Sequence, residues 1–261
     1  MANNCFEVCS LASGSKGNSL FVGYNDQGIL VDAGLSGVEI QRRLSARGIS
    51  PERLTAIIIT HEHSDHIRGA GVLNRRFNIP VYITPKTFQA CSSLGTMTGV
   101  CFFEGGRAFD IGRVRVTPFS ISHDATDPVG LTLETQGQKI GVATDLGVAT
   151  NLVKNHLKNS SLLYLESNHD LEMLLNGPYP WHLKQRIKSR TGHLSNTDTR
   201  QLVSELRTDR LKHVILAHLS EENNCPKKAA DEVATGLNAS GIKLHVAGPD
   251  QPGELIRLEV S

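Results

Sequence analysis

The residues best suited to chemistry in this sequence are three histidines and an aspartate within six consecutive positions. In the segment THEHSDH, His61, His63, Asp65 and His66 follow an apolar, β-branched run that ends at Thr60. Imidazole and carboxylate groups are the ligands that zinc and related divalent ions prefer. A strand that ends and turns into a loop can direct all four side chains towards one point. The spacing therefore predicts a metal site at the end of a strand.

Three further potential ligands each end an apolar segment later in the chain. His123 follows VTPFSIS, Asp145 ends IGVATD and His218 ends HVILAH. Imidazole and carboxylate side chains at strand ends can meet at one edge of a fold and complete the ligand set. Together with the first motif, these residues provide enough ligands for two metal ions.

The composition is typical of one globular domain, which we expect to span residues 1–261. Hydrophobic residues make up 39% and charged residues 20%, and the net charge of +1 excludes a global attraction to nucleic acid or membrane. No apolar run reaches the roughly 18 residues that span a bilayer. The N-terminus has no signal-peptide pattern, and the five cysteines lack C-x-x-C spacing. We therefore expect a cytoplasmic protein with reduced thiols and no membrane partner.

The order of apolar patterns predicts a layered α/β (α+β) sandwich. The N-terminal half is rich in short strand patterns, at residues 6–12, 19–24, 28–34, 55–60, 81–84, 113–122, 130–135 and 139–145. Helices are expected at 36–48 and after residue 66. The C-terminal half mixes helices and strands. Its helices are expected at 149–159, on both sides of 176–180, at 195–207 and at 226–241, and its strands at 161–167, 212–218, 242–248 and 254–260.

The ligand pattern resembles that of the metallo-β-lactamase superfamily, in which H-x-H-x-D-H is followed by His, Asp and His at strand ends. The resemblance covers nearly the whole chain and implies a four-layer αββα sandwich with the metals at one edge between the sheets. It implies one metal held by His61, His63 and His123, a second held by Asp65, His66 and His218, and Asp145 as the bridge. The ligand types allow two ions of zinc, manganese or iron, with zinc or manganese favoured.

Asp145 at the bridging position separates this chain from other branches of that superfamily. Lactamases tend to carry Cys there, and the oxygen-reducing diiron members carry Glu where this chain has His63. The resemblance therefore implies a hydrolase of phosphodiesters or thioesters. Two metals about 3.5–4 Å apart lower the pKa of a bound water, so that hydroxide is available near neutral pH. Asp65 is expected to orient that hydroxide.

Two residues outside the ligand set are candidates for proton transfer. His193 lies in TGHLSN, which resembles a G-H-x-S/T segment found before a helix in nucleases of the superfamily. Its imidazole would stabilise the leaving oxygen. Glu166 ends the apolar strand pattern LLYLE, and its carboxylate would orient His193 or a metal ligand.

Several short segments in order are similar to the YycJ/WalJ family of bacterial metal-dependent nucleases. These segments are SLASGSKGNS, THEHSDH, ISHD, TDLG, LESNHD, GHLSN and HLSEENN. The resemblance implies 5′-to-3′ exonuclease activity, with DNA favoured over RNA as the partner. The compact length and near-neutral charge also allow an alternative, a hydrolase of cyclic phosphodiesters or thioesters on the same scaffold.

The segment SGSKGNS has the composition of a phosphate-binding loop but not its pattern. It lacks G-x-x-x-x-G-K-[ST] and connects two strands rather than opening a helix, so no nucleotide cofactor is expected. It is either a tight turn or a rim of the metal cleft. In the second interpretation, Ser15, Lys16 and Asn18 would contact a substrate phosphate.

The segment PWHLKQRIKSRTGH places basic residues beside an aromatic one, just before His193. Lys184 and Arg186 near Trp181 would suit a phosphate backbone and a stacked base. A solvated amphipathic helix is the alternative interpretation of the same pattern.

Overall fold

Two seven-stranded mixed sheets pack face to face in the computed structural model, which describes residues 5–91, 93–237 and 241–260. The first sheet contains, in spatial order, β14 (Ile256–Glu259), β1 (Cys5–Ala12), β2 (Ser19–Tyr24), β3 (Gln27–Val31), β4 (Leu54–Ile58), β5 (Val81–Ile83) and β6 (Val100–Phe102). The second contains β13 (Lys243–Val246), β12 (His213–Ala217), β11 (Leu162–Glu166), β10 (Gln138–Ala143), β9 (Val129–Thr135), β8 (Val114–Ser120) and β7 (Phe109–Ile111).

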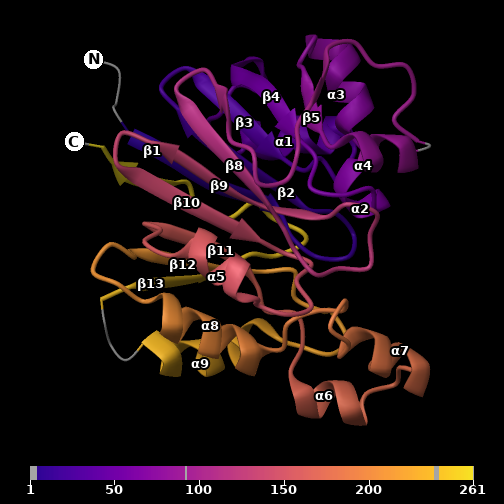
Figure 1. Ribbon diagram of the computed structural model, residues 1–261, viewed down its shortest axis with the longest axis vertical. Helices are drawn as coiled ribbons and strands as arrows, with labels where there is room; N and C mark the ends of the chain where they lie inside the picture. Colours follow the sequence, from indigo (N-terminus) through magenta and orange to yellow (C-terminus); the bar gives the residue numbers. More distant parts are fainter. Residues whose placement is uncertain (1–4, 92, 238–240, 261) are drawn as a thin grey trace.

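Helices cover the outer face of each sheet and complete the four layers (Figure 1). On the first sheet lie α1 (Gly37–Ser45), α3 (Ala70–Phe77) and α4 (Pro85–Ala90), and on the second lie α5 (Asn151–Leu157), α8 (Asn196–Leu206) and α9 (Pro226–Leu237). Three short elements lie elsewhere: α2 (Ser64–Ile67), α6 (Leu171–Asn176) and α7 (Trp181–Ile187), and a 3₁₀ turn covers Pro51–Arg53. The predicted αββα sandwich is therefore confirmed. None of the described helices is both long and apolar enough to cross a membrane.

The core between the sheets is built from the alternate residues that each strand turns inward. Phe6, Val22, Val116, Leu131 and Tyr164 are all buried in this cluster. Separate apolar clusters join each sheet to its helices. Burial of each large apolar side chain contributes about 1.5–3 kcal/mol to folding, so the sheet pair is a rigid frame for the loops at its edge.

Local signals in the sequence set most of the element boundaries. Ser195 begins α8 with a reciprocal capping box, because its hydroxyl accepts from the Asp198 backbone while the Asp198 carboxylate accepts from the Ser195 backbone. Gln136 and Gly137 both have positive φ, 44° and 75°, in the turn of the β9–β10 hairpin. The expected helix at 226–241 is observed over Pro226–Leu237, and residues 238–240 lie outside the described part of the chain.

Two regions differ from the sequence-based expectation. The strands β6 and β7 and the helix α4 were not predicted, because edge strands of three residues are too short to carry a periodic apolar pattern. The helix expected after residue 180 ends at Ile187, so it covers only the first half of the basic segment PWHLKQRIKSRTGH. Beyond it the chain forms a loop, in which the His193 backbone N–H donates to the Ile187 carbonyl at 2.9 Å.

The loop after β3 braces the segment that carries the predicted metal ligands. The backbone N–H of Ala33 donates to the His66 carbonyl, and that of Asn18 donates to the Asp65 carbonyl, both at 2.7 Å. Gly34 lies between these segments, and its own N–H donates to the Asn18 carbonyl at 2.8 Å. A Cβ at this glycine would lie 1.6 Å from the Asp65 carbonyl oxygen, so only glycine allows the backbones to approach this closely.

We predict that Gly34→Ala lowers both the free energy of unfolding, by about 1–3 kcal/mol, and the metal content of the purified protein. The added methyl group must displace the Asp65 backbone, because the clash is with main-chain atoms. Chemical denaturation and elemental analysis measure the two effects. Gly248→Ala is the matched control, since a Cβ there has no atom within 4 Å. Wild-type stability and metal content in Gly34→Ala would contradict the prediction.

Candidate metal centre

The seven side chains that the sequence predicts as metal ligands meet at one edge of the sandwich. They form three overlapping groups, in each of which one potential ligand atom per residue lies within 4.8 Å of the others. These groups are His61, His63 and His123; His61, His66 and Asp145; and Asp65, His66 and His218. The residues come from both sheets, so neither sheet alone could form the centre.

Five of the seven side chains follow a strand end, and the other two, Asp65 and His66, lie on the short helix α2. His61 and His63 follow β4, His123 follows β8, Asp145 follows β10 and His218 follows β12. Asp145 and His218 have positive φ values of 57° and 55°, which residues other than glycine rarely adopt. The chain therefore turns sharply after the strand at these two positions, and tertiary contacts hold this strained backbone.

The first group of histidines presents three ring nitrogens to one another. The Nδ1 atom of His63 lies 3.1 Å from Nε2 of His61 and 3.4 Å from Nε2 of His123. The Thr60 hydroxyl donates its proton to Asp32 Oδ2 at 2.8 Å. The same oxygen therefore accepts from Nδ1–H of His61 at 3.0 Å. That contact leaves the Nε2 lone pair of His61 directed into the group, where a divalent ion would be bound.

The second group combines carboxylates with imidazoles. His66 Nε2 lies 3.3 Å from Asp145 Oδ2 and 3.5 Å from Asp65 Oδ2, and His218 Nε2 lies 3.9 Å from the same Asp65 oxygen. His123 Nε2 lies 3.8 Å from Asp145 Oδ1. The Asp145 carboxylate therefore lies between the two groups, as a bridging ligand would.

Unpartnered buried atoms test whether these residues fit metal ions. Asp145 Oδ2 and His218 Nε2 are buried in the centre without a hydrogen-bond partner. A buried polar atom without a partner costs free energy, which coordination of an ion would recover. The donor set of imidazole and carboxylate suits zinc, manganese or iron, so the residues fit the dinuclear site that is typical of this arrangement.

The charges of the centre favour bound cations. Burial would raise the pKa of the Asp145 carboxyl, but the positive charges on His218 and His66 hold it well below its ordinary value. Asp65 behaves in the same way: the nearby His218 and His66 imidazoles outweigh burial and keep its pKa low. Burial, followed by the charge on His66, lowers the pKa of His61. The carboxylates are thus ionised and His61 is neutral at neutral pH, which are the forms that bind metal. The neighbouring carboxylates outweigh burial and raise the pKa of His66, to about 10, and that of His218, so these two imidazoles would release a proton when metal binds.

Asp32 is a functional residue that the sequence analysis missed. Its carboxylate accepts from the Thr60 backbone N–H at 2.9 Å, from the Thr60 hydroxyl at 2.8 Å and from His66 Nδ1 at 2.8 Å. These contacts orient His66 with Nε2 towards the centre. The sequence could have indicated this residue, because Asp32 ends the apolar pattern GILVD in the same way that His123, Asp145 and His218 end theirs.

Glu166 connects the metal centre to His193. The carboxylate is fully buried, and its Oε1 accepts from Nδ1 of His193 at 2.7 Å and from Nδ1 of His218 at 2.8 Å. Its Oε2 accepts from the backbone N–H groups of Leu146 and Leu194 at 2.9 and 3.1 Å. Burial opposes ionisation, but the charge on His193 and these hydrogen bonds lower the pKa of Glu166 to about 2. The sequence left two roles open for this carboxylate, and here it contacts both a metal ligand and His193.

A cleft of about 210 Å³ opens in front of the centre. His193 lies on its wall, with its ring centroid 5.4 Å from that of His123 and 5.2 Å from that of His218. Because Nδ1 of His193 is bound to Glu166, its Nε2 is the nitrogen left for a group in the cleft. The arrangement therefore combines a metal centre with a positioned imidazole.

The predicted contacts in the segment SGSKGNS have different surroundings. Ser15 lines the cleft. Lys16 is 66% exposed and forms an ion pair with Glu221 at 2.7 Å. Asn18 is buried, its amide donates to Asp65 Oδ2 at 3.1 Å, and the same amide nitrogen lies 3.0 Å from His66 Nε2. Asn18 thus contacts the ligands themselves, while the other two residues lie at the surface where a substrate could approach.

The two predicted basic contacts on α7 also separate. Arg186 lines the cleft and forms an ion pair with Asp124 at 2.9 Å. The structure does not bring Lys184 to the cleft. Its buried ammonium donates to the carbonyl groups of Leu175 and Gly177 at 2.8 and 2.7 Å, where it caps the end of α6. Lys184, which lies on α7, therefore links this helix to the end of α6 through two hydrogen bonds.

Comparison with known proteins is consistent with this geometry. Residues 27–219 match the model of the Beta-lactamase superfamily domain. The chain is 37% identical to Exodeoxyribonuclease YycJ of Bacillus anthracis, over 94% of this chain and 96% of the relative. It is 39% identical to Exodeoxyribonuclease WalJ of Streptococcus pneumoniae, over 86% of this chain and 85% of the relative.

Solved structures show the same fold at low sequence identity. The metallo-β-lactamase fold protein YhfI of Bacillus subtilis superposes with a TM-score of 0.76 at 16% identity, covering 98% of this chain and 100% of the other. A diphosphatase of the PhnP family gives a TM-score of 0.70 at 15% identity, with coverage of 98% and 99%. At these identities the likeness extends to the fold alone.

We predict that Asp32→Asn weakens binding of the more loosely held metal ion about 10- to 100-fold. The amide has one acceptor oxygen. It therefore cannot accept from the Thr60 backbone N–H at the Oδ1 position and also from the Thr60 hydroxyl and His66 Nδ1 at the Oδ2 position, so the His66 ring loses its fixed orientation. Asparagine tolerates the positive φ of 59° at this position, so the fold should persist. Competition with a chromophoric chelator measures the affinity, and circular dichroism checks the fold. The control is Asp26→Asn, an exposed residue in the β2–β3 turn. Wild-type affinity for both ions in Asp32→Asn would rule out this role.

Proposed function

The chain belongs to the metallo-β-lactamase superfamily and is a metal-dependent hydrolase, and on that premise we propose that it is an exonuclease that hydrolyses the phosphodiester bonds of DNA. The names of its relatives, YycJ and WalJ, support exonuclease activity on DNA rather than RNA. The family resemblance adds 5′-to-3′ polarity to the proposal. We also propose that the protein acts in the cytoplasm, where it would encounter DNA.

His193 is the observation that carries the proposal. Breaking a phosphodiester bond leaves an alkoxide, which needs a proton or a positive charge. Nδ1–H of His193 donates to the ionised Glu166, so the imidazole keeps one orientation and its Nε2 faces the cleft. From this position, the imidazolium form would donate the Nε2 proton to the leaving oxygen. Glu166 touches no reacting atom, so we assign it a positioning role.

The ligand assignment forms the second part of the proposal. One ion would be held by His61, His63 and His123, the other by Asp65, His66 and His218, with Asp145 shared between them. When bound, two divalent ions act as Lewis acids and lower the pKa of water. We favour zinc or manganese, since both accept mixed imidazole and carboxylate ligands. The Asp65 carboxylate would accept a hydrogen bond from the attacking water and orient it.

Residues at the rim would hold the DNA backbone. The Arg186 side chain is 63% exposed, and among the described residues its one ion-pair partner is Asp124, so a phosphate group could replace that carboxylate. A guanidinium binds two phosphate oxygens at once. Ser15 and Lys16 lie on the loop at another part of the rim, where they would contact the strand beyond the scissile bond.

The small volume of the cleft supports a second candidate function. About 210 Å³ suits one nucleotide or a small phosphodiester, whereas a longer strand must extend outside it. A hydrolase of cyclic phosphodiesters or thioesters would need only the cleft. A panel of 5′-phosphorylated single- and double-stranded DNA, RNA, cyclic dinucleotides and thioesters distinguishes the two functions. Turnover of the small compounds alone would exclude the nuclease.

We predict that Asp65→Asn reduces turnover of DNA by at least 10²- to 10⁴-fold without unfolding the protein. The amide that replaces the Asp65 carboxylate has one acceptor oxygen instead of two, and it is a weaker ligand for a divalent ion. Nuclease assays with matched metal content measure the loss, and they also exclude contaminating activity. Asp110→Asn, which changes an exposed residue on β7 by the same charge, is the control. Near-wild-type turnover in Asp65→Asn would refute the assigned role.

We predict that Lys16→Ala weakens DNA binding severalfold while turnover at saturation stays near wild type. The ammonium would contribute only a screened attraction to phosphate, so the difference should grow as salt is lowered. Filter binding at two salt concentrations and steady-state kinetics measure it. Lys227→Ala, which removes an exposed charge from α9, is the control. Equal affinity of Lys16→Ala and wild type at low salt would show that SGSKGNS is only a turn.

A further inference from the structure

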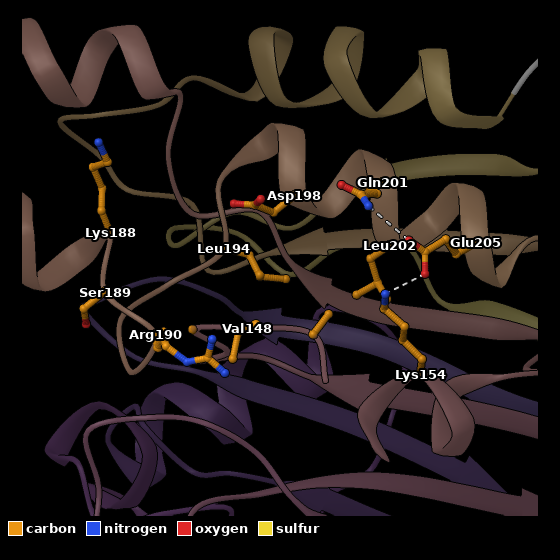
Figure 2. Close-up of a pocket in the computed structure, with 12 residues that line it drawn as sticks. Val148, Lys154, Lys188, Ser189, Arg190, Leu194, Asp198, Gln201, Leu202 and Glu205 are labelled. Atoms are coloured by element: carbon orange, nitrogen blue, oxygen red, sulfur yellow. Dashed lines mark hydrogen bonds and ion pairs between the residues drawn. The ribbon is translucent and has the colours of Figure 1, made fainter. Parts of the chain in front are cut away.

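A second cavity shares a wall with the catalytic cleft. The loop from Lys188 to Leu194 separates the two: Thr191, Gly192 and His193 line the cleft, whereas Lys188, Ser189, Arg190 and Leu194 line the second cavity. The rest of its lining comes from the segment before α5, from α5 and from α8 (Figure 2). The volume of about 330 Å³ lies within the range of small-molecule sites, which is about 300–1,000 Å³.

The acidic groups of this cavity already have partners within the chain. Glu205 accepts from Lys154 Nζ at 2.7 Å and from Gln201 Nε2 at 3.2 Å, as Figure 2 shows. Asp198 accepts from the backbone N–H and the hydroxyl of Ser195 as part of the α8 cap. These contacts neutralise or occupy both carboxylates.

The basic groups contributed by the loop have no such partners. Within the described part of the chain, neither the Lys188 nor the Arg190 side chain takes part in a hydrogen bond or an ion pair. Both residues are exposed. The Arg190 guanidinium extends along the cavity towards Val148, whereas the Lys188 side chain at the rim points away from it (Figure 2). The charge left to a ligand is therefore positive, and the planar guanidinium is suited to a phosphate.

Apolar side chains line another part of the cavity, and a side chain that can form hydrogen bonds lies beside them. Val148 and Ala149, which are partly exposed, form an apolar surface that is backed by the buried side chains of Leu194 and Leu202. Gln201 on α8 lies beside that surface, and its amide carbonyl can accept a hydrogen bond from a polar edge (Figure 2). An inorganic anion would leave this surface uncovered, whereas a ligand with a phosphate and a flat heterocycle would contact both parts.

We propose that this cavity binds a nucleoside monophosphate, with the phosphate at Arg190, the base against the apolar surface, and Lys188 adding positive charge at the rim. Such a ligand would be distinct from a nucleotide in the catalytic cleft. It belongs to the chemical class that an exonuclease releases, so the cavity would sense the product. That role in turnover rests on the proposed function, but the binding itself does not.

The loop connects this cavity to the catalytic residues through short contacts. The Arg190 carbonyl accepts from the Ser122 hydroxyl at 2.7 Å, and the Thr191 carbonyl accepts from the Asp124 N–H at 3.1 Å, on either side of His123. The Leu194 N–H donates to Glu166, which holds His193. A ligand bound at Arg190 therefore restrains the loop that carries His193, and the rate of turnover changes with its occupancy.

Calorimetric titration of the metal-loaded protein with dAMP tests the binding site. We expect two binding events in the wild type, one at the metal centre and one at the cavity. The double variant Lys188→Ala/Arg190→Ala should lose the second event, or bind there at least 10-fold more weakly, and keep the first. Lys227→Ala/Lys228→Ala on α9 changes the net charge equally and should behave as wild type. Identical titrations of the wild type and the loop variant would overturn the proposal.

Two further arms of the titration test the ligand class and the location. Inorganic phosphate should bind at the cavity at least 10-fold more weakly than dAMP, because it cannot use the apolar surface. Ala149→Phe should remove the same event without changing any charge, since the added ring fills the cavity. Equal affinity for phosphate and dAMP, or an unchanged second event in a folded Ala149→Phe protein, would contradict binding of a nucleotide there.

Hydrolysis of bis(p-nitrophenyl) phosphate tests the effect on turnover. Nucleotide bound at the metal centre competes with substrate and raises KM in every variant. Nucleotide in the cavity should lower kcat severalfold in the wild type and leave kcat unchanged in Lys188→Ala/Arg190→Ala. A kcat that dAMP affects equally in both proteins would refute the sensing role. If DNA is not cleaved but the second binding event is present, the proposed nuclease fails and the cavity assignment stands.

Discussion

One buried carboxylate, that of Glu166, holds together the parts of the site that come from different elements. Removing an ionised carboxylate from water costs several kcal/mol unless hydrogen bonds and opposite charges offset the loss. Glu166 receives four such bonds, two from the backbone at Leu146 and Leu194 and two from His193 and His218. Displacing any of these donors would leave part of the charge unpaired. The cost of burying the Glu166 charge without these donors thus keeps His218, a proposed metal ligand, and His193, the proposed proton donor, in fixed positions relative to each other.

Asp32 plays the same part on the first sheet. It is buried, and it fixes His66 and Thr60 as Glu166 fixes His193 and His218. Each sheet thus carries one buried carboxylate that orients the imidazoles at its edge. The centre forms where these two edges meet, so its geometry depends on the packing of one sheet against the other. The apolar core between the sheets is for that reason a determinant of the metal site as well as of stability.

The loop between α7 and α8 lines both the catalytic cleft and the second cavity. It begins where α7 stops at Ile187 and carries His193 on the side of the cleft. Its other side presents Arg190 to a separate cavity. Hydrogen bonds from Ser122 and Asp124 tie it to the strand end that bears His123. A short, well-anchored segment of this kind can transmit an event in one cavity to the other, because its two faces cannot move independently.

The sequence by itself determined which imidazole and carboxylate groups are candidates for a metal centre, since an apolar run followed by His or Asp is a local pattern. The capping of α8 by Ser195 and the turn at Gln136 and Gly137 are local in the same sense.

Only the tertiary structure decided which polar side chains face the site. Lys184 and Arg186 are two positions apart on one helix, yet Lys184 caps α6 and Arg186 lines the cleft. Asn18 lies against metal ligands rather than at the rim, because Gly34 allows the two loops to approach each other. Such outcomes depend on contacts between residues far apart in the chain, which no local pattern of residue types encodes.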